Sequence, residues 1–303
     1  MKTVSNVLFL VLSFFMSAFT FGPLAEYCAP APPEIPVAAD TLTQEITVMS
    51  FNVYYQKTGE HGLPNRLNGV VQTIRKEMPD SFGLQEAHAD WRDALLRELG
   101  GQYAIACERG RAFEDDEGAP IFYRKDRYEL VSEEQFWLSL WPGRPSYSWG
   151  TSFPRIAGYA VLRDKTTGFT YAHFNAHFDN FSGTARVNSA RMIADRVNAM
   201  GLPAVFTADA NAAPGSKPME YLEAGGLTDM RKAAAVTDEG ITYNDFRDDG
   251  PLLGCLLNNT VLDYIYANHY LREAAEFKVI RDKYDGTYPS DHFATAARLT
   301  LAN

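Results

Sequence analysis

The segment that most constrains the fold runs from Tyr171 to Asn180 and reads YAHFNAHFDN. From Tyr171 to Asp179 the even positions are all apolar, whereas the odd positions are polar or semi-polar. This alternation with a period of two predicts a β-strand with one face in a hydrophobic core and the other lined by hydrogen-bonding and titratable groups. Two histidines and an asparagine on one strand face are unusual. They indicate either a functional site or a polar sheet face that holds two histidines without a role.

Length and charge narrow the possible functions. The chain has 303 residues, which is enough for one large α/β domain and does not require two. Its net charge is −10 and its pI is near 5.1, so it lacks the overall basic surface with which proteins grip nucleic acid through phosphates. If the substrate carries a phosphate, the positive charge must come from a metal ion or a few local arginines.

The N-terminal segment resembles a signal peptide. Lys2 precedes an apolar run from Val7 to Phe21, which is too short to span a bilayer but suits a signal-peptide core. A buried or interfacial first helix is the alternative. We expect a signal peptide over residues 1–27 with an uncertain cleavage point, a Pro-rich linker over 28–43, and a folded domain over 44–303. The protein would then be secreted or periplasmic, without a stable membrane span, and we expect a monomer. Cys107 and Cys255 are either paired or free buried thiols.

Strands and helices alternate loosely along the rest of the chain. Apolar patterns predict strands over 46–53, 81–86, 120–123, 202–208, 261–267 and 293–301, and helices over 66–77, 89–99 and 184–200. The charged turn from Arg124 to Arg127 is expected to join the strand 120–123 to a hairpin partner, Tyr128 to Val131. The aromatic segment 135–154 is expected to be a loop that either binds rings or packs on its own. This mixture favours two packed sheets flanked by helices.

Polar residues recur at the ends of the predicted strands, and together they suit phosphoryl chemistry. The set is Asn52, Glu86, His177, Asp209, Asn211, Asp263, Asp291 and His292. Carboxylate and amide oxygens favour Mg²⁺, Mn²⁺ or Ca²⁺ over zinc, and such a set can orient a water for in-line attack. A Ser nucleophile elbow and a Walker phosphate loop are absent from the sequence. Asp263 lies among apolar residues, so it needs a partner.

In order and spacing, these residues resemble the endonuclease/exonuclease/phosphatase superfamily. The resemblance rests on SFNV, LQEAH, FNAHFDN, TADANAAP, LDYIYAN and PSDHFA, and it covers about residues 44–301. It implies the deoxyribonuclease-I-like fold, an α+β four-layer αββα sandwich of two mixed sheets flanked by helices. The segments PIFYRK, FWLS and FPR, together with Arg186, resemble the secreted bacterial-type branch.

The resemblance also implies roles for the metal and the attacking water. Glu86 would be the principal metal ligand, with Asn52 beside it and Asp291 as a third candidate ligand. The metal would be Mg²⁺, or else Mn²⁺ or Ca²⁺. Asp209 would orient or deprotonate the water.

The remaining residues would act on the phosphate. Asn211 and His177 would donate hydrogen bonds to the phosphoryl oxygens. His292 would contact the phosphate while Asp263 holds it, and Arg186 would bind substrate. Each also has a structural interpretation, as a turn residue or an ion pair. We expect His173 to have no catalytic role.

Three departures leave the substrate open. Gly-Asp-Phe-Asn of the family is here Ala208-Asp209-Ala210-Asn211, Leu-Asp-His is Phe178-Asp179-Asn180, and the loop before PIFY reads ERGRAFEDDEGA. The sequence favours a secreted divalent-metal-dependent phosphoesterase that acts on a phosphodiester or phosphomonoester, with nucleic acid, sugar phosphate and lipid phosphate all possible substrates. The alternatives are a non-catalytic binding protein on the same scaffold and a membrane-tethered interaction domain.

Overall fold

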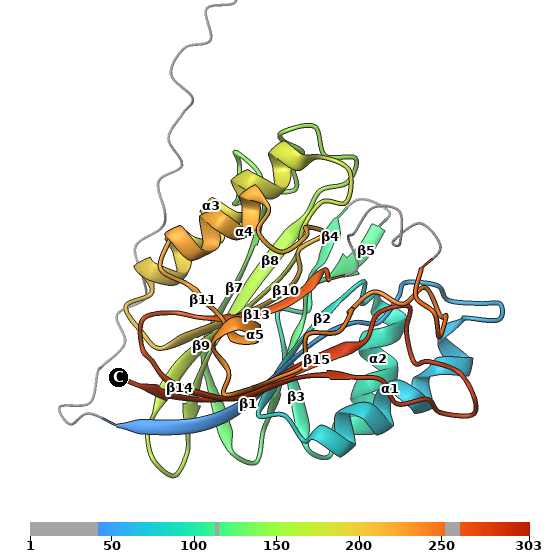
Figure 1. The fold of residues 1–303 in the computed structure, drawn as a ribbon, viewed down its shortest axis with the longest axis horizontal. Helices are drawn as coiled ribbons and strands as arrows, with labels where there is room; N and C mark the ends of the chain where they lie inside the picture. The colour runs from blue at the N-terminus through green and yellow to red at the C-terminus, as the bar shows by residue number, and fades with distance from the viewer. Residues whose placement is uncertain (1–41, 113–114, 252–260) are drawn as a thin grey trace, which may run out of the picture.

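Two β-sheets stacked face to face form the centre of the structure, a computed structural model that describes residues 42–112, 115–251 and 261–303 (Figure 1). Helices α1 (Leu63–Glu77) and α2 (Ala89–Leu99) cover the outer face of one sheet. Helices α3 (Gly183–Ala199) and α4 (Lys217–Ala224) cover the outer face of the other. This arrangement confirms the predicted four-layer αββα sandwich. The predicted signal peptide and almost all of the predicted linker lie outside the described residues.

The sheet next to α1 and α2 is mixed. Its strands are β1 (Thr43–Asn52), β2 (Ser81–Gln85), β3 (Tyr103–Ala106), β6 (Ile121–Arg124), β12 (Val236–Thr237), β14 (Leu271–Ile280) and β15 (Ala294–Ala302). They lie in the order β12-β14-β15-β1-β2-β6-β3. β1 pairs in parallel with β2 and antiparallel with β15, which places the first and last strands of the domain side by side.

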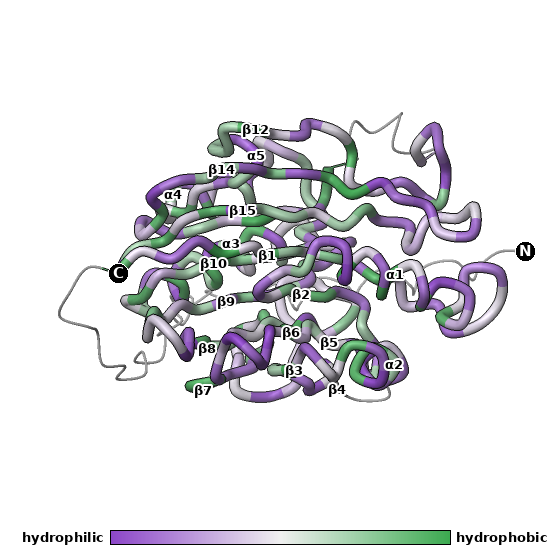
Figure 2. Tube along the Cα trace, turned by 90° about the horizontal axis from the view of Figure 1, so that it is seen from below, coloured by the Kyte–Doolittle hydropathy of each residue, from purple (hydrophilic) through white to green (hydrophobic). Residues whose placement is uncertain are grey.

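The sheet next to α3 and α4 is also mixed. Its strands are β7 (Tyr128–Trp137), β8 (Ile156–Asp164), β9 (Thr170–His177), β10 (Ala204–Asp209), β11 (Thr228–Asp229) and β13 (Asp263–Ala267). Their order is β11-β13-β10-β9-β8-β7, with β9 and β10 parallel. Figure 2 shows β10, β9, β8 and β7 of this sheet in succession. The strands β4 (Gly110–Ala112) and β5 (Asp115–Gly118) pair with each other, and the short helix α5 (Met230–Ala233) follows β11.

Three hydrophobic cores fill the spaces between the four layers. In β1, Ile46 and Val48 pack between the sheets, whereas Met49 and Phe51 pack against α1 and α2. A strand with both faces buried needs apolar residues at successive positions, which explains the unbroken apolar run of ITVMSFNV. On the far side, α3 packs against the second sheet through Ile193 and its neighbours.

The central strand β9 is buried on both faces and ends at His177, three residues before the predicted end. Phe174 and Ala176 face the core beneath α3. On the other face, His173 Nδ1 lies 2.7 Å from Ser81 Oγ, and His173 Nε2 lies 2.9 Å from Thr207 Oγ1. The polar side of the alternation therefore faces the first sheet, where its groups hydrogen-bond across the interface. His173 is a satisfied interior histidine, as expected.

The predicted hairpin between residues 120–123 and 128–131 is wrong. β6 pairs with β2 and β3 in the first sheet, whereas β7 pairs with β8 in the second. Arg127 lies in the turn that crosses between the sheets. Its guanidinium lies 2.6 Å from Asp80, which precedes β2, and 2.8 Å from Asp164 at the end of β8. The charged turn thus joins two layers by ion pairs.

Several other boundaries differ from the predictions. β8, β14 and α4 were not predicted, and the start of the predicted loop 135–154 belongs to β7, where Phe136 and Trp137 are buried. Cys107 is a buried free thiol, and Cys255 lies outside the described residues. Within the described ranges, none of the helices has the length and apolar character to cross a bilayer.

Candidate active site

The strand pairings bring the predicted polar residues to one edge of the sandwich. Asn52 ends β1 opposite Gln85 of β2, and Glu86 follows directly. In the second sheet, Asp209 at the end of β10 pairs with His177 of parallel β9 and with Asp263 of antiparallel β13. The two edges meet, because the Asn52 amide nitrogen donates to Asp209 Oδ2 over 2.9 Å. Residues far apart in the sequence thus share one rim.

Glu86 and Asp291 form an acidic pair on the first sheet's side of this rim. Glu86 has a left-handed backbone with φ of 58°, and its carboxylate accepts hydrogen bonds from Asn52 Nδ2 (3.1 Å) and the Tyr55 backbone N–H (2.9 Å). Asp291 accepts from Ser290 Oγ, which also donates to the Asn52 carbonyl over 2.7 Å. Burial raises the pKa of Asp291 to about 7, and the negative charge of Glu86 adds to this rise.

These residues have the chemistry of a hard-cation site. Glu86 accepts from the Asn52 side chain, and Asp291 accepts from Ser290, which also donates to the Asn52 carbonyl, so both carboxylates flank the end of β1 and could offer oxygen ligands to one cation. The Asn52 amide presents its nitrogen to Glu86, while its oxygen accepts from the Tyr54 backbone N–H over 3.0 Å. An oxygen ligand from Asn52 therefore requires rotation of the amide.

Arg66 holds the two segments that carry this acidic pair. The side chain is buried and donates to the carbonyls of Val53 and Tyr54 after β1, and to that of Pro289 just before Ser290. Its positive charge also lowers the pKa of Asp291, against the larger effect of burial. The sequence analysis did not single out Arg66, because only tertiary packing directs its guanidinium to these carbonyls.

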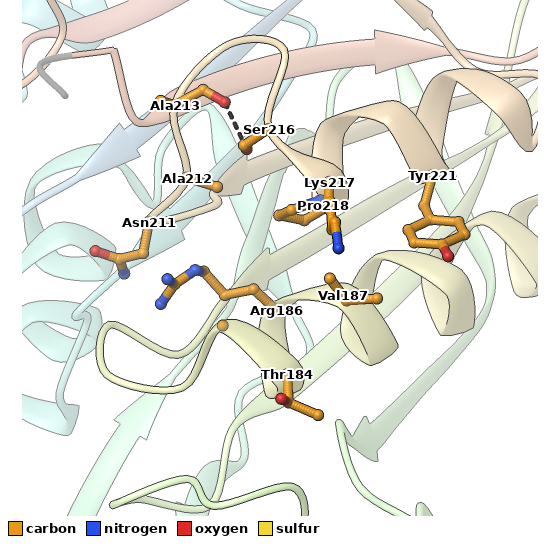
Figure 3. Close-up of a pocket in the computed structure, with 11 residues that line it drawn as sticks. Thr184, Arg186, Val187, Asn211, Ala212, Ala213, Ser216, Lys217, Pro218 and Tyr221 are labelled. Carbon is orange, nitrogen blue, oxygen red and sulfur yellow. Dashed lines mark hydrogen bonds between the residues drawn. The ribbon is translucent and has the colours of Figure 1, made fainter. Parts of the chain in front are cut away.

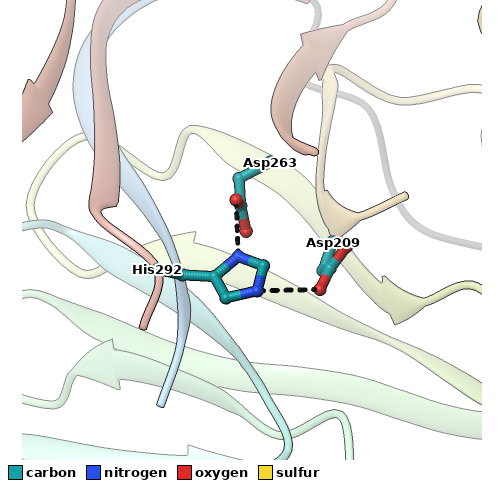
Figure 4. A group of neighbouring side chains, drawn as sticks. All are labelled: Asp209, Asp263 and His292. Atoms are coloured by element: carbon teal, nitrogen blue, oxygen red, sulfur yellow. Dashed lines mark hydrogen bonds and ion pairs between the residues drawn. The ribbon is translucent and has the colours of Figure 1, made fainter. Parts of the chain in front are cut away.

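On the second sheet's side, Asp263, His292 and Asp209 form a chain (Figure 4). His292 Nδ1 lies 2.8 Å from Asp263 Oδ2, and His292 Nε2 lies 3.8 Å from Asp209 Oδ2. Burial alone would lower the pKa of His292, but Asp263 and Asp209 outweigh it and raise that pKa well above the usual value. The hydrogen bond to His292 satisfies one oxygen of Asp263, and the other, Oδ1, has no hydrogen-bond partner among the described residues.

This trio is a second possible cation site, since one ligand atom from each residue lies within 4.8 Å of the others. We favour the acidic pair for two reasons. His292 and Asp263 already neutralise each other, so a cation would have to displace the shared proton. A site with an imidazole ligand also suits a softer cation than Mg²⁺.

Asp209 lies at the centre of the rim. It accepts hydrogen bonds from the Asn52 amide and, over 2.9 Å, from the Asn211 backbone N–H, and it lies 3.5 Å from His177 Nε2. Burial alone would raise the pKa of Asp209, but His177, His292 and these hydrogen bonds lower it overall. Asp209 is therefore held as a carboxylate.

His177 has a partner that the sequence analysis missed. Its Nδ1 lies 2.9 Å from Glu117 Oε1 on β5, and its Nε2 lies 3.0 Å from the Asn211 amide nitrogen. Glu117 is buried and also forms ion pairs with Arg111 (2.8 Å) and Arg155 (3.5 Å). The only signal was the acidic loop ERGRAFEDDEGA, in which five carboxylates compete and no spacing selects one.

Arg186 lies beside the rim, in a pocket of about 750 Å³ between α3 and α4 (Figure 3). Its guanidinium donates to the Asp179 carbonyl over 2.8 Å. Asn211 lines the same pocket, and its backbone N–H donates to Asp209, so the pocket adjoins the rim at this residue. The structure therefore brings eight of the predicted residues to the rim and places Arg186 next to them.

The family assignment follows from the comparison of this chain with known proteins. Residues 49–292 match the endonuclease/exonuclease/phosphatase family. The chain belongs to this family. Its members hydrolyse phosphoester bonds, and the family typically uses divalent metals. No sequence among curated proteins matches the chain significantly.

Solved structures of the family share the fold. A family protein from Bacteroides thetaiotaomicron is 27% identical with a TM-score of 0.78, covering 86% of this chain and 99% of that one. A mannosyl-6-phosphatase from Bacteroides thetaiotaomicron VPI-5482 is 27% identical with a TM-score of 0.76, covering 84% and 99%. The catalytic domain of human Nocturnin with bound sulfate, 18% identical with a TM-score of 0.62 and covering 87% and 97%, shares the fold.

Proposed function

We propose that this protein is a divalent-metal-dependent phosphoesterase that hydrolyses small phosphate esters by in-line attack of water. The observation that carries the proposal is the arrangement around Asp209. This carboxylate touches Asn52, which contacts the acidic Glu86, and it faces both His177 and His292. A base, two imidazoles and a cation site within one rim are the components that phosphoryl transfer to water requires.

Glu86 and Asp291 would hold the cation, with Asn52 as a further ligand after its amide rotates. When bound, the ion would neutralise charge on the phosphoryl oxygens. Asp209 is ionised and would orient the attacking water and accept its proton. The attacking oxygen would form a bond to phosphorus as the bond to the ester oxygen breaks.

The two histidines would hold the phosphoryl group. His292 is kept protonated by Asp263 and Asp209, so its Nε2–H can donate to a phosphoryl oxygen. The Asn211 amide nitrogen faces His177 Nε2 and donates to the Phe178 carbonyl, so it would exchange one of these contacts to donate to another phosphoryl oxygen. Both histidine side chains are oriented by buried carboxylates, which limits the reorganisation required during the reaction.

A small substrate fits the charge of the protein better than a polynucleotide does. The net charge of −10 disfavours broad contact with a nucleic-acid backbone. A relative of 27% identity is a mannosyl-6-phosphatase, which supports a sugar phosphate as the first class to test. Nuclease and lipid phosphodiesterase activities are tested in the same assay as alternatives.

The experiment is a phosphate-ester panel with added Mg²⁺ and with chelator. It includes sugar phosphates, inositol phosphates, sphingomyelin, RNA and plasmid DNA. We expect turnover that chelator abolishes and Mg²⁺ restores. Glu86→Gln should lower kcat by about 10²-fold or more. Glu129→Gln, which changes an exposed glutamate paired with Arg163, should leave kcat unchanged. Metal-independent turnover, or full activity of Glu86→Gln, would contradict the proposal.

A non-catalytic binding protein was suggested only by the altered TADAN segment. Ala208 and Ala210 are buried, and Asp209 and Asn211 keep their contacts with His177. The lost glycine and aromatic residue therefore leave the chemical groups of the rim in place. Retained affinity without turnover in the same panel would favour the binding protein.

We also propose that the protein is exported after removal of residues 1–27, because the N-terminal apolar run has the length of a signal-peptide core. Mass spectrometry of the mature N-terminus tests this. An intact Met1 in the purified native protein would overturn it and would support a retained N-terminal anchor.

A further inference from the structure

The pocket between α3 and α4 differs in charge from the rest of this acidic protein. It is lined by two cations, Arg186 and Lys217, and none of its lining residues is a carboxylate. Thr184 and Ser216 add hydroxyl groups. In Figure 3, Arg186 extends from α3 toward Asn211, and Lys217 reaches into the same space from the start of α4. A chain with 38 acidic and 28 basic residues thus has a locally positive hollow beside the rim.

Lys217 has no partner in the described ranges, which sets it apart from the other lysines there. Five of the others form ion pairs and two donate to backbone carbonyls; they are Lys57, Lys76, Lys232, Lys278, Lys283, Lys125 and Lys165. Lys217 is also the first residue of α4, where the positive end of the helix dipole disfavours a cation. Lys217 is exposed and Glu220 lies in the same first turn of α4, so the ammonium is solvated and free to contact an anion in the pocket.

Arg186 is half-buried and prearranged. Its Nη1 is held by the Asp179 carbonyl, and burial lowers its pKa from the usual value. The carbonyl occupies one nitrogen of a guanidinium that carries five donors, so the remaining donors can face the pocket. A flexible, unpaired ammonium and a fixed guanidinium around one hollow form a clamp for an anion.

We propose that this pocket binds a second anionic group of the substrate, a phosphate or carboxylate separate from the phosphate that is hydrolysed. The inference rests on the proposed function and specifies its substrate class, namely small phosphate esters with two anionic groups. The hydrolysed phosphate would lie at the rim, between Asn211 and the two histidines. The second group would extend past Asn211 toward Arg186 and Lys217, and the hydroxyls of Thr184 and Ser216 suit a sugar or polyol between them.

The test compares glucose 6-phosphate with glucose 1,6-bisphosphate in the presence of Mg²⁺. Lys217→Ala should raise KM for the bisphosphate about fivefold to tenfold, the size of a partly exposed charged hydrogen bond. For the monophosphate it should change KM less than twofold, and Lys217→Glu should exaggerate the difference. Lys76→Ala removes another exposed lysine, paired with Asp282, from α1 on the opposite outer layer, and should change neither value. Thermal unfolding of each variant checks that the fold is intact.

The result that overturns the inference is an equal effect of Lys217→Ala on both esters, or no effect. If neither ester is hydrolysed, calorimetric titration of both into the wild-type protein and Lys217→Ala decides the matter. Tighter binding of the bisphosphate that weakens in Lys217→Ala supports the pocket, while the absence of turnover counts against the proposed hydrolysis. Equal binding of both esters, or binding of neither, overturns the pocket.

Discussion

Glu117 allows a sharp test of how the rim is built. Replacement by Gln keeps the shape of the side chain and removes its charge. The carboxylate lies 2.9 Å from His177 Nδ1, 2.8 Å from Arg111 and 3.5 Å from Arg155, and all four side chains are less than 10% exposed. Burial alone would raise the pKa of Glu117, but His177, Arg155 and Arg111 hold it well below the usual value.

The expected loss of stability follows from this burial. Removing one partner of a buried ion pair typically costs about 3–5 kcal/mol, because the remaining charge stays buried without compensation. Gln retains hydrogen-bonding capacity, and Arg155 keeps Asp179 at 3.5 Å, so we expect about 3 kcal/mol. Because the folded pKa lies below the unfolded value near 4.5, this contribution is fully present above that pH. The difference between the two proteins should therefore shrink only as the pH falls below about 4.5.

The expected loss of activity is larger than instability explains. Gln offers Nδ1 of His177 a weaker, uncharged acceptor and no longer fixes the ring orientation, so kcat should fall by about 10²–10³-fold at temperatures where the variant is fully folded. Urea denaturation gives the stability and steady-state kinetics gives kcat, with Glu129→Gln as the exposed control, expected to cost less than about 1 kcal/mol. A folded Glu117→Gln enzyme with wild-type kcat would refute the reasoning that Glu117 orients His177.

Two further predictions concern the interface between the sheets. Burial lowers the pKa of His173 to about 3. Between pH 6.5 and 3 the unfolded chain therefore binds a proton that the folded protein excludes. As the pH decreases through this window, the free energy of unfolding decreases by up to about 1.4 kcal/mol per pH unit. His173→Gln should show a shallower fall in urea denaturation between pH 6 and 4, and parallel curves would contradict this. In β2, a Cβ on Gly83 would lie 2.3 Å from Thr207 Oγ1 and 2.4 Å from the Asn175 amide. Gly83→Ala should cost about 1–3 kcal/mol in thermal unfolding, whereas Gly143→Ala, with open space around it, should be neutral; equal effects would show that the interface yields to the methyl group.

Local patterns determined much of this architecture. β1 was predictable from sequence because a strand buried on both faces requires apolar residues at successive positions. The central strand β9 was predictable because a strand with one polar face requires strict alternation. The helices α1, α2 and α3 were readable from their 3–4 spacing. The polar residues at strand ends were conspicuous because Asn52 and Asp263 are out of place in such apolar surroundings.

Pairing between distant strands was decided only by the tertiary structure. The segment 120–131 reads locally as a hairpin, but Arg127 bridges Asp80 and Asp164 and divides the segment between the sheets. β14 was missed because its exposed edge mixes charged residues into the apolar pattern.

The sequence by itself placed the chemical groups of the site, because each one interrupts an apolar strand end. It could not select Glu117 from five carboxylates in one loop, nor assign Arg66 to the carbonyls around Asp291. It also could not show that Lys217 lacks a counter-ion. These properties depend on which side chains meet across the gap between the sheets and helices, and such distances are set by packing rather than by order along the chain.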